Sequence, residues 1–389
     1  MFNLSRFGEL LGLLPRGVFE RAVEQNKADR YRKSFSCWQQ LVAMLYVQFR
    51  GASSLRVVES GFNALLPHHY HLGCKTLHRS TLADSNAKAQ AVPAFEQLAG
   101  HLMQQVRGKV RQECRELLQI IDSSSVTVKG PGAQWAKHTR TKHAPGVKLH
   151  VVFEGEEAAP LAVQISDGNV SDVEYANQLS LEDDTTYVFD RGYCDYGLWW
   201  RIEQKSSRFV TRFKRNAKLE VVKERGIPKN AAGMILKDEE VRFANKRPGA
   251  GRVNPYTKML RRIEVAREGK PALVLATNDM KSSALKISQR YKQRWQIELF
   301  FKWIKQHLKI KQLLGRSKSA VSIQILSALI AYLLVWIYKS THKIKKSLWM
   351  LLAEIASTLF ERTETQLHRH RRWREARSEI DSLQASLFT

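Results

Sequence analysis

Apolar residues in the first part of the chain recur with the spacing of helices. Within Trp38–Gln48 they fall at positions i, i+3 and i+7, and Leu55, Val58 and Phe62 continue the period. Such a stripe lets one face of each helix pack on a core while the other face stays polar. We therefore predict a small helical domain over residues 1–100.

The end of this domain carries a segment suited to nucleic acid, Lys75–Asn86. Basic residues come early in it and short polar side chains follow, which is typical of a helix that enters a groove or lies on phosphates. A helix that is merely solvated fits the same residues. Both interpretations stay open at this point.

From Leu117 onward the pattern changes to short apolar or alternating runs, which predict strands. The runs lie at 117–122, 147–153, 160–165 and 185–190, with a helical stretch at 171–179 before the last. Three hairpin-linked strands, a helix and a strand parallel to the first predict an α/β fold with a mixed sheet. A helix at 197–205 and a fifth strand at 209–213 follow.

Residues 214–278 break this alternation. They hold Gly, Pro and Lys between scattered β-type runs, so we predict an inserted β-rich subdomain, followed by a long helix from about 283 to 309. The predicted domains are 1–100 (helical), 101–213 and 279–340 (two parts of one core), 214–278 (insertion) and 341–389 (basic helical region). The last includes the basic run 368–374, which fits phosphate contact as well as a solvated face.

One segment, Ala320–Tyr338, contains no charged side chain over 19 positions. That is close to the roughly 20 residues that a membrane-spanning helix needs. The polar residues Ser322, Gln324 and Ser327 within it, and the charged chain before it, favour a buried core helix. A single-span membrane protein is the alternative.

The net charge of the chain predicts a polyanionic partner. The 389 residues include 63 Lys and Arg against 37 Asp and Glu, a formal net charge of +26. A surplus of this size repels itself unless a polyanion lies against it, so we expect nucleic acid or an anionic membrane surface. The 4 Cys are far apart with no Cys-x-x-Cys pair, which predicts free thiols and a cytoplasmic location.

Two carboxylates mark candidate chemistry in the predicted sheet. Asp122 ends an apolar strand before three serines, and Asp190 ends the strand predicted to pair parallel to it. Neighbouring carboxylates at one sheet edge can share a divalent cation, because hard oxygen ligands suit Mg²⁺ and Mn²⁺. An Asp that merely closes a strand before a turn is the plainer interpretation of each.

The predicted long helix carries a third acidic residue. At 100° per residue, one narrow stripe holds Tyr291, Arg294, Glu298 and Lys305, with Lys302 and Lys309 beside it. The opposite face holds Ile297, Phe300 and Ile304, which we expect to pack on the core. A surface helix with an Arg294–Glu298 ion pair is the alternative interpretation.

Together, these residues resemble the DDE transposases of bacterial insertion sequences of the IS-four type. The resemblance rests on Ile-Asp122-Ser-Ser, on Asp190-Arg-Gly-Tyr193, and on the Tyr-x2-Arg-x3-Glu-x6-Lys spacing from Tyr291 to Lys305. It spans roughly residues 35–340. It implies an RNase H-like catalytic core interrupted by a β-rich insertion, with a helical DNA-binding domain in front.

The resemblance also implies roles for single residues. Asp122, Asp190 and Glu298 would hold two Mg²⁺ or Mn²⁺ ions. DNA contacts near the cut end would come from a second group: Tyr291, Arg294, Lys305, Arg191 and Lys302. Characterised relatives stack a flipped base on a Trp of the insertion, whereas residues 214–278 contain no Trp. Phe243 and Tyr256 are the candidates to replace it, although neither can be matched to the motif.

The predicted function is therefore cut-and-paste transposition. The protein would bind the inverted-repeat ends of its element, cleave them by metal-dependent hydrolysis and join the 3′-OH ends to target DNA, as a homodimer at the bacterial nucleoid. An RNase H-like nuclease without strand transfer and a non-enzymatic DNA-binding protein are the alternatives. We expect substitutions of four other acidic residues to matter less: Asp167, Asp172, Asp183 and Asp184. Asp172 is the least certain, since it could lie near the same sheet edge.

Overall fold

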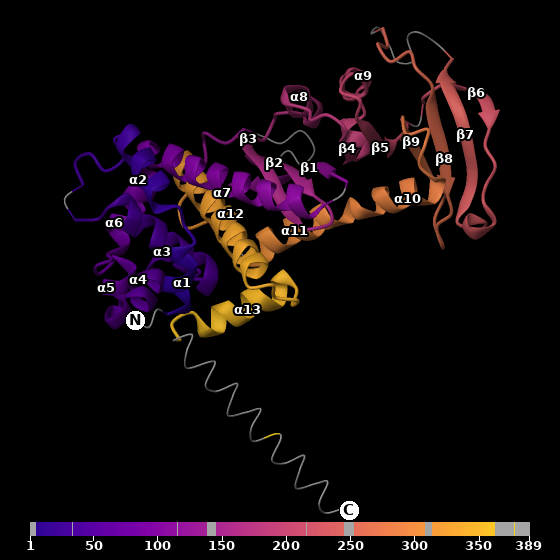
Figure 1. Cartoon of the computed structure of the whole chain (residues 1–389). Coiled ribbons are helices and arrows are strands. Elements are labelled where there is room, and N and C mark those ends of the chain that lie inside the picture. Colours follow the sequence, from indigo (N-terminus) through magenta and orange to yellow (C-terminus); the bar gives the residue numbers. More distant parts are fainter. Residues whose placement is uncertain are drawn as a thin grey trace, which may run out of the picture. The chain divides into compact units, whose positions relative to one another are not determined.

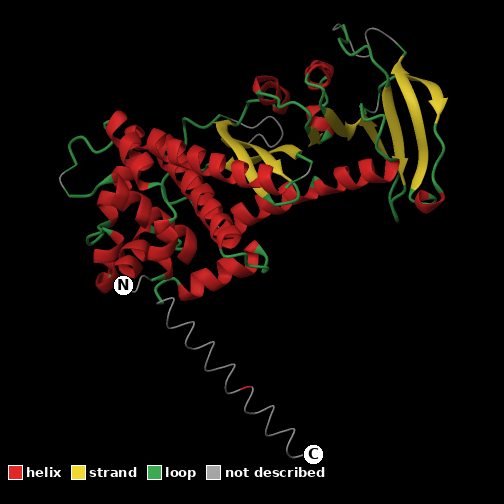
Figure 2. Cartoon of the chain, in the orientation of Figure 1, coloured by secondary structure: helices red, strands yellow, loops and turns green. Residues whose placement is uncertain are grey.

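The computed structural model describes residues 5–32, 34–114, 116–137, 145–214, 216–244, 253–307, 313–361 and 377. The chain divides into two compact units, one of Met103–Trp303 and one that combines Met1–Leu102 with Ile304–Thr389 (Figure 1). The described strands gather in the first of these (Figure 2). The predicted mixed α/β fold is confirmed, whereas the basic run 368–374 and Lys309 lie outside the described residues.

The unit with both chain ends is helical where it is described, as predicted for residues 1–100. Its N-terminal helices are α1 (Arg6–Gly12), α2 (Arg16–Gln25), α3 (Cys37–Arg50), α4 (Leu55–Asn63), α5 (Leu66–Leu72) and α6 (Arg79–Ala87). Helix α3 begins in a capping box between Ser36 and Gln39, which satisfies two end groups of the backbone at once. It ends at Gly51, whose φ of 67° is a left-handed conformation that glycine adopts without strain.

The apolar segment forms helix α12 (Lys318–Thr341), which packs against α3, α6 and α13 (Leu348–Thr358) in the same unit. By length and composition α12 could cross a membrane, but 94% of its apolar window is buried inside the protein. Its Gln324 accepts a hydrogen bond from the Leu314 N–H at 2.9 Å. The structure therefore places this segment as a core helix, and in the helical unit, whereas we had expected it in the core that carries the acidic residues.

Over its described residues, the other unit is built on a nine-stranded sheet in the order β3-β2-β1-β4-β5-β9-β8-β7-β6. Its strands are β1 (Leu118–Thr127), β2 (Gly146–Glu154), β3 (Ala159–Asp167), β4 (Thr186–Phe189), β5 (Arg208–Arg212), β6 (Leu219–Glu224), β7 (Ile235–Phe243), β8 (Leu260–Val265) and β9 (Leu273–Thr277). Strands β1, β2 and β3 form an antiparallel meander, and β4 and β5 run parallel to β1. This is the mixed pairing that the sequence predicts.

The first strand is longer than predicted. Strand β1 does not end at Asp122 but continues to Thr127, because β2 keeps pairing with it over that length. Its parallel pairing with β4 does end there, since the last paired residues are Ile121 and Phe189. Asp122 thus follows the point at which β1 loses its parallel neighbour.

The predicted β-rich insertion continues this sheet. Strand β9 pairs antiparallel with β5, with Val210 opposite Thr277, and β8, β7 and β6 follow in turn. The segment 214–278 is therefore β-rich as predicted, but its strands lengthen the sheet of the core.

Helices lie on both faces of the part of the sheet formed by β1 to β5 (Figure 1). Helices α8 (Asp172–Gln178) and α9 (Tyr196–Gln204) lie on one face, where Trp199 is fully buried between Phe209 and Tyr256. The same hydrophobic core takes in Phe243, whose ring lies 4.6 Å from that of Tyr196. Tyr256 is buried in this core, so its ring is not open to a base, whereas Phe243 packs against the core and is only partly buried.

The other face carries the predicted long helix, which is divided in two. Helix α10 (Ala284–Gln293) ends before Arg294 and α11 (Trp295–His307) starts after it. At the junction the Arg294 N–H donates to the Tyr291 carbonyl at 3.1 Å, three residues back instead of four. The prediction of one uninterrupted helix was wrong at this residue.

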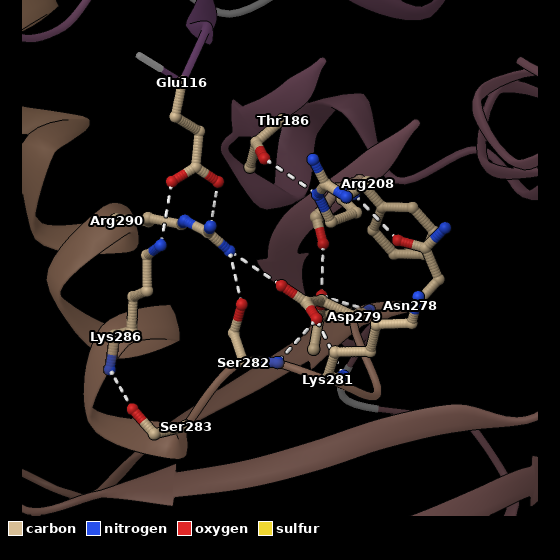
Figure 3. A network of polar contacts seen from close by, with 12 residues as sticks. Glu116, Thr186, Arg208, Asn278, Asp279, Lys281, Ser282, Ser283, Lys286 and Arg290 are labelled. Carbon is tan, nitrogen blue, oxygen red and sulfur yellow. Dashed lines mark hydrogen bonds and ion pairs between the residues drawn. The ribbon is translucent and has the colours of Figure 1, made fainter. Parts of the chain in front are cut away.

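A partly buried ion network connects α10 to the loop after β9 and to Glu116 before β1 (Figure 3). Arg290 donates to Asp279 at 2.7 Å and to Ser282 at 3.2 Å on one side, and pairs with Glu116 on the other. Lys286 pairs with Glu116 at 2.9 Å. Because the charges of Asp279 and Arg290 are nearly buried, their pairing holds α10 in one orientation on the sheet.

Candidate active site

Strand geometry brings Asp122 and Asp190 to the same sheet edge. Each follows the last residue of the β1–β4 parallel pairing, and side-chain alternation directs both carboxylates to the face covered by α10 and α11. Their side chains are 20% and 39% exposed, respectively. A backbone N–H holds each one, since Ser123 donates to Asp122 at 2.8 Å and Arg191 donates to Asp190.

Helix α11 adds Glu298 through an arginine. Arg294 donates to the Glu298 carboxylate at 2.6 Å, and its other terminal nitrogen lies 3.7 Å from the Asp122 carboxylate. A second arginine, Arg212 at the end of β5, pairs with Asp190. Two guanidinium groups therefore balance three acidic side chains, and Arg294 joins the sheet edge to the helix.

The two aspartates differ in electrostatic environment. Burial raises the pKa of Asp122 to about 6, although the Ser123 N–H and Arg294 oppose this, and the charges of Asp190 and Asp172 raise it further. Burial acts in the same direction on Asp190, but Arg212 and the Arg191 N–H outweigh it, so the pKa of Asp190 lies below its ordinary value. Neighbouring acids whose pKa values are pushed apart are typical of catalytic sites.

These residues offer the ligands of a divalent cation. Three carboxylates supply hard oxygen atoms, the donors that Mg²⁺ and Mn²⁺ prefer. Across the described ranges, no three His, Cys, Asp or Glu side chains stand close enough to hold a metal as they lie. One Glu298 oxygen accepts from Arg294 in this arrangement. The donor set fits the predicted metal in its chemistry.

The predicted DNA-contact residues lie in different surroundings. Tyr291 is buried with its ring 5.8 Å from the Arg294 guanidinium, and burial raises the pKa of its phenol. Lys302 is exposed on α11, and Arg191 is half-buried next to Asp190. Lys305 follows Glu298 on α11 in the part of that helix that belongs to the other unit. The structure thus brings Tyr291, Arg294 and Arg191 to the carboxylates.

The helix face beside Glu298 is partly apolar and open. Trp295 is 58% exposed and Leu299 is 42% exposed, four residues apart on α11. An exposed Trp beside a cationic Lys302 is the combination on which single-stranded nucleic acid stacks.

Sequence reasoning missed the residues behind this edge. Arg212 gives no signal in the sequence beyond its place near a strand end, and Lys148 and His150 are only two polar positions of an alternating strand. The side chains of Lys148 and His150 lie on the face of the sheet opposite Asp122, as Asp172 does. Lys148 lies 2.8 Å from the Asp172 carboxylate, and the His150 ring stacks on Tyr175 at a distance of 4.4 Å. The alternation of polar Lys148 and His150 within an otherwise apolar strand was the feature of the sequence that could have identified these two residues.

Comparison with known proteins assigns the chain to a family. Residues 113–334 match the family described as "Transposase DDE domain", and residues 3–75 match a domain of unknown function, DUF4372. Because the first match covers more than half of the chain, the protein belongs to the DDE transposases. That prediction is confirmed; the assignment to the IS-four type stays a prediction.

Individual relatives are similar over most of their length. The chain is 38% identical over 286 residues to a Sinorhizobium fredii protein named as transposase y4zB, covering 73% of this chain and 78% of that one. It is 29% identical over 276 residues to a Geobacillus stearothermophilus protein named as a transposase for insertion sequence element IS5377, covering 70% of each. A solved piggyBac transposase synaptic complex with hairpin DNA aligns with a TM-score of 0.46 at 10% identity, over 90% of this chain and 77% of that one, which is too distant to guide interpretation.

Proposed function

We propose that this transposase moves its element by a cut-and-paste reaction. It would bind the terminal inverted repeats, cut the DNA at both ends by hydrolysis so that the element is released, and join the freed 3′-OH ends to target DNA. One observation carries the proposal: Asp122 and Asp190 follow adjacent parallel strands at one sheet edge, and Arg294 connects that edge to Glu298. The strand order β3-β2-β1-β4-β5 fits the RNase H-like core that we predicted.

Asp122, Asp190 and Glu298 would hold two Mg²⁺ or Mn²⁺ ions. Bound there, such ions supply a nucleophile at neutral pH and stabilise the leaving oxygen of the phosphodiester. The low pKa of Asp190 keeps that carboxylate ionised, while Asp122 ionises above about pH 6. Asp122 and Asp190 are therefore both ionised only near or above neutral pH.

The arginines of the site would bind the DNA strand. When Glu298 leaves Arg294, the freed guanidinium can donate two parallel hydrogen bonds to a phosphate, a geometry that lysine cannot supply. Tyr291 packs beside Arg294 and limits its orientations. Arg191, Lys302 and Lys305 would add charge along the strand, and holding the phosphate in line with the attacking oxygen supplies much of the rate.

The net charge of +26 supports a DNA partner, because each phosphate neutralised by Lys or Arg releases a bound counterion. Trp295 and Leu299 provide a surface on which unpaired bases next to the cut can stack. We propose a homodimer because two element ends must be held together for joining, and a location at the bacterial nucleoid, where target DNA lies.

The proposal is tested by cleavage and joining assays on DNA from the two ends of the element. Asp122→Asn, Asp190→Asn and Glu298→Gln should each lose Mg²⁺-dependent cleavage by at least about 1,000-fold while keeping end binding, since metal ligation and phosphate contact use different residues. Asp183→Asn is the matched control, because that side chain is 77% exposed. Cleavage without joining would favour the nuclease alternative, and binding without cleavage the non-enzymatic one.

A further inference from the structure

On the opposite face of the sheet from the three candidate carboxylates, a fourth acidic residue, Asp172, contacts the strand that carries Asp122. Asp172 is the first residue of α8, where Ser171 caps the helix by accepting from the Glu174 N–H at 3.1 Å. Side-chain alternation turns Ser123 away from Asp122, toward α8. There the Ser123 hydroxyl donates to the Asp172 carboxylate at 2.5 Å.

We propose that Asp172 is a positioning residue that sets the places of Asp122 and Asp190. This inference rests on the proposed function of those two carboxylates. Asp172 reaches Asp122 through one intermediate, because Ser123 donates its hydroxyl to Asp172 and its N–H to the Asp122 carboxylate at 2.8 Å. Moving Asp172 therefore moves the donor that orients Asp122.

The same carboxylate also adjoins the turn after Asp190. A Cβ placed on Gly192 would lie 3.8 Å from an Asp172 oxygen, which is ordinary contact distance. Gly192 belongs to the short helix Arg191–Tyr193 that follows Asp190. Asp172 thus lies between the two segments that carry the acidic residues and fixes their separation.

Asp172 is itself held in place. The Lys148 ammonium group lies 2.8 Å from it and also donates to the Val170 carbonyl at 3.3 Å. The fully buried His150 lies next to it: one ring nitrogen contacts Ser166 at 2.9 Å, and the other lies 3.9 Å from Asp172, beyond hydrogen-bond distance. A carboxylate engaged by Ser123 and Lys148 on this face of the sheet is suited to support and not to metal ligation.

The inference is tested on the full-length protein with Asp172→Ala, Ser123→Ala and the double variant. Glu174→Gln is the matched control, because Glu174 is an exposed acid in the same helical turn. We measure the cleavage rate against Mn²⁺ concentration, metal-free DNA binding, and the melting temperature. Substitution of a group that orients a metal ligand typically lowers activity or metal affinity by about 10- to 100-fold.

We expect Asp172→Ala to lower cleavage and to raise the half-saturating Mn²⁺ concentration by about 10-fold or more, with DNA binding unchanged. Ser123→Ala should act in the same direction, and the double variant should be no worse than Asp172→Ala, because both residues act through one connection. Additive losses, or a lower melting temperature with normal Mn²⁺ dependence, would mean that Asp172 only stabilises the fold.

Three further outcomes show whether the inference fails alone or together with the proposed function. Normal cleavage by Asp172→Ala beside an inactive Asp122→Asn would overturn the inference alone. Complete loss of metal binding in Asp172→Ala, as in Asp122→Asn, would make Asp172 a ligand and overturn the positioning role. Normal cleavage by Asp122→Asn would refute the proposed function and the inference together.

Discussion

Replacing Asp122 by Asn should make the metal-free protein more stable, although it should abolish catalysis. Burial raises the pKa of Asp122 from its ordinary value of 3.8 to about 6. The folded protein therefore prefers the neutral carboxyl, and the stability that this group contributes is present below pH 3.8 and is lost as the pH rises through about 6. Asn resembles the neutral form at every pH.

The size of the gain follows from the two pKa values. A difference of about 2 pKa units, at about 1.4 kcal/mol each, gives about 3 kcal/mol at pH 8. Because 20% of the Asp122 side chain is exposed, solvent reduces this to about 2–3 kcal/mol. At pH 4.5, where Asp122 is largely protonated in the folded protein, the stability gain of the variant over wild type falls to about 1 kcal/mol.

Urea unfolding in EDTA at pH 8 and pH 4.5, followed by tryptophan fluorescence, measures both values. Trp199 is fully buried in the same unit and reports its unfolding. Asp190→Asn is the opposing control: because the pKa of Asp190 is lowered, its stabilising charge is lost as the pH falls, so the variant should be less stable than wild type at pH 8 and closer to it in acid. An Asp122→Asn variant no more stable than wild type at pH 8 would refute the electrostatic account of the site.

Four further results are expected. Arg294→Ala and Lys305→Ala should retain Mn²⁺ binding but lose strand transfer more than the first nick, and Arg294→Lys should rescue only partly; normal strand transfer in any of them would remove that residue from DNA contact. Trp199→Ala should cost about 3–5 kcal/mol in urea unfolding, and a loss below about 1 kcal/mol would contradict its place in the core. Trp295→Ala should leave the melting temperature unchanged and weaken binding of ends with unpaired bases, by about 1–3 kcal/mol in a gel-shift titration, whereas equal binding would exclude stacking. The affinity of the full-length protein for element ends should fall linearly with salt on logarithmic axes, and a flat response would exclude phosphate contacts as its main source.

Local patterns were sufficient to predict most elements of the sheet unit. The runs at 147–153 and 209–213 match β2 and β5 within one residue or two, because buried strands need continuous or alternating apolar side chains. The end of β1 was missed for the same reason. Its residues Ser123–Ser125 are polar, and only pairing with β2 keeps them in a strand.

Long-range packing was harder to anticipate. The apolar stretch of α12 identified a buried helix but not its neighbours, since α3 lies more than 250 positions earlier in the sequence. A fragment of residues 1–100 would leave uncovered the α3 surface that α12 buries, so that region should not be expected to fold as a separate domain.

In the candidate site too, local spacing could be predicted from the sequence and long-range contacts could not. Helical spacing correctly placed Arg294 and Glu298 on one stripe, because residues four apart are neighbours on a helix. It could not show that Arg294 approaches Asp122, or that Arg212 meets Asp190, because those contacts depend on how α11 and β5 meet the sheet edge.

The continuity of β5 with β9 has a consequence for where this chain can accept insertions or deletions. The insertion begins after β5, and its last strand, β9, pairs with β5. Strands can therefore be added or lost at the β6 end of the sheet without changing the register of β1 and β4. Its outermost strand, β6, carries Glu220, Lys223 and Glu224 among exposed valines, and such charges discourage edge-to-edge association. The β6 end is therefore where hairpins of different size, or an engineered fusion, are most easily accommodated.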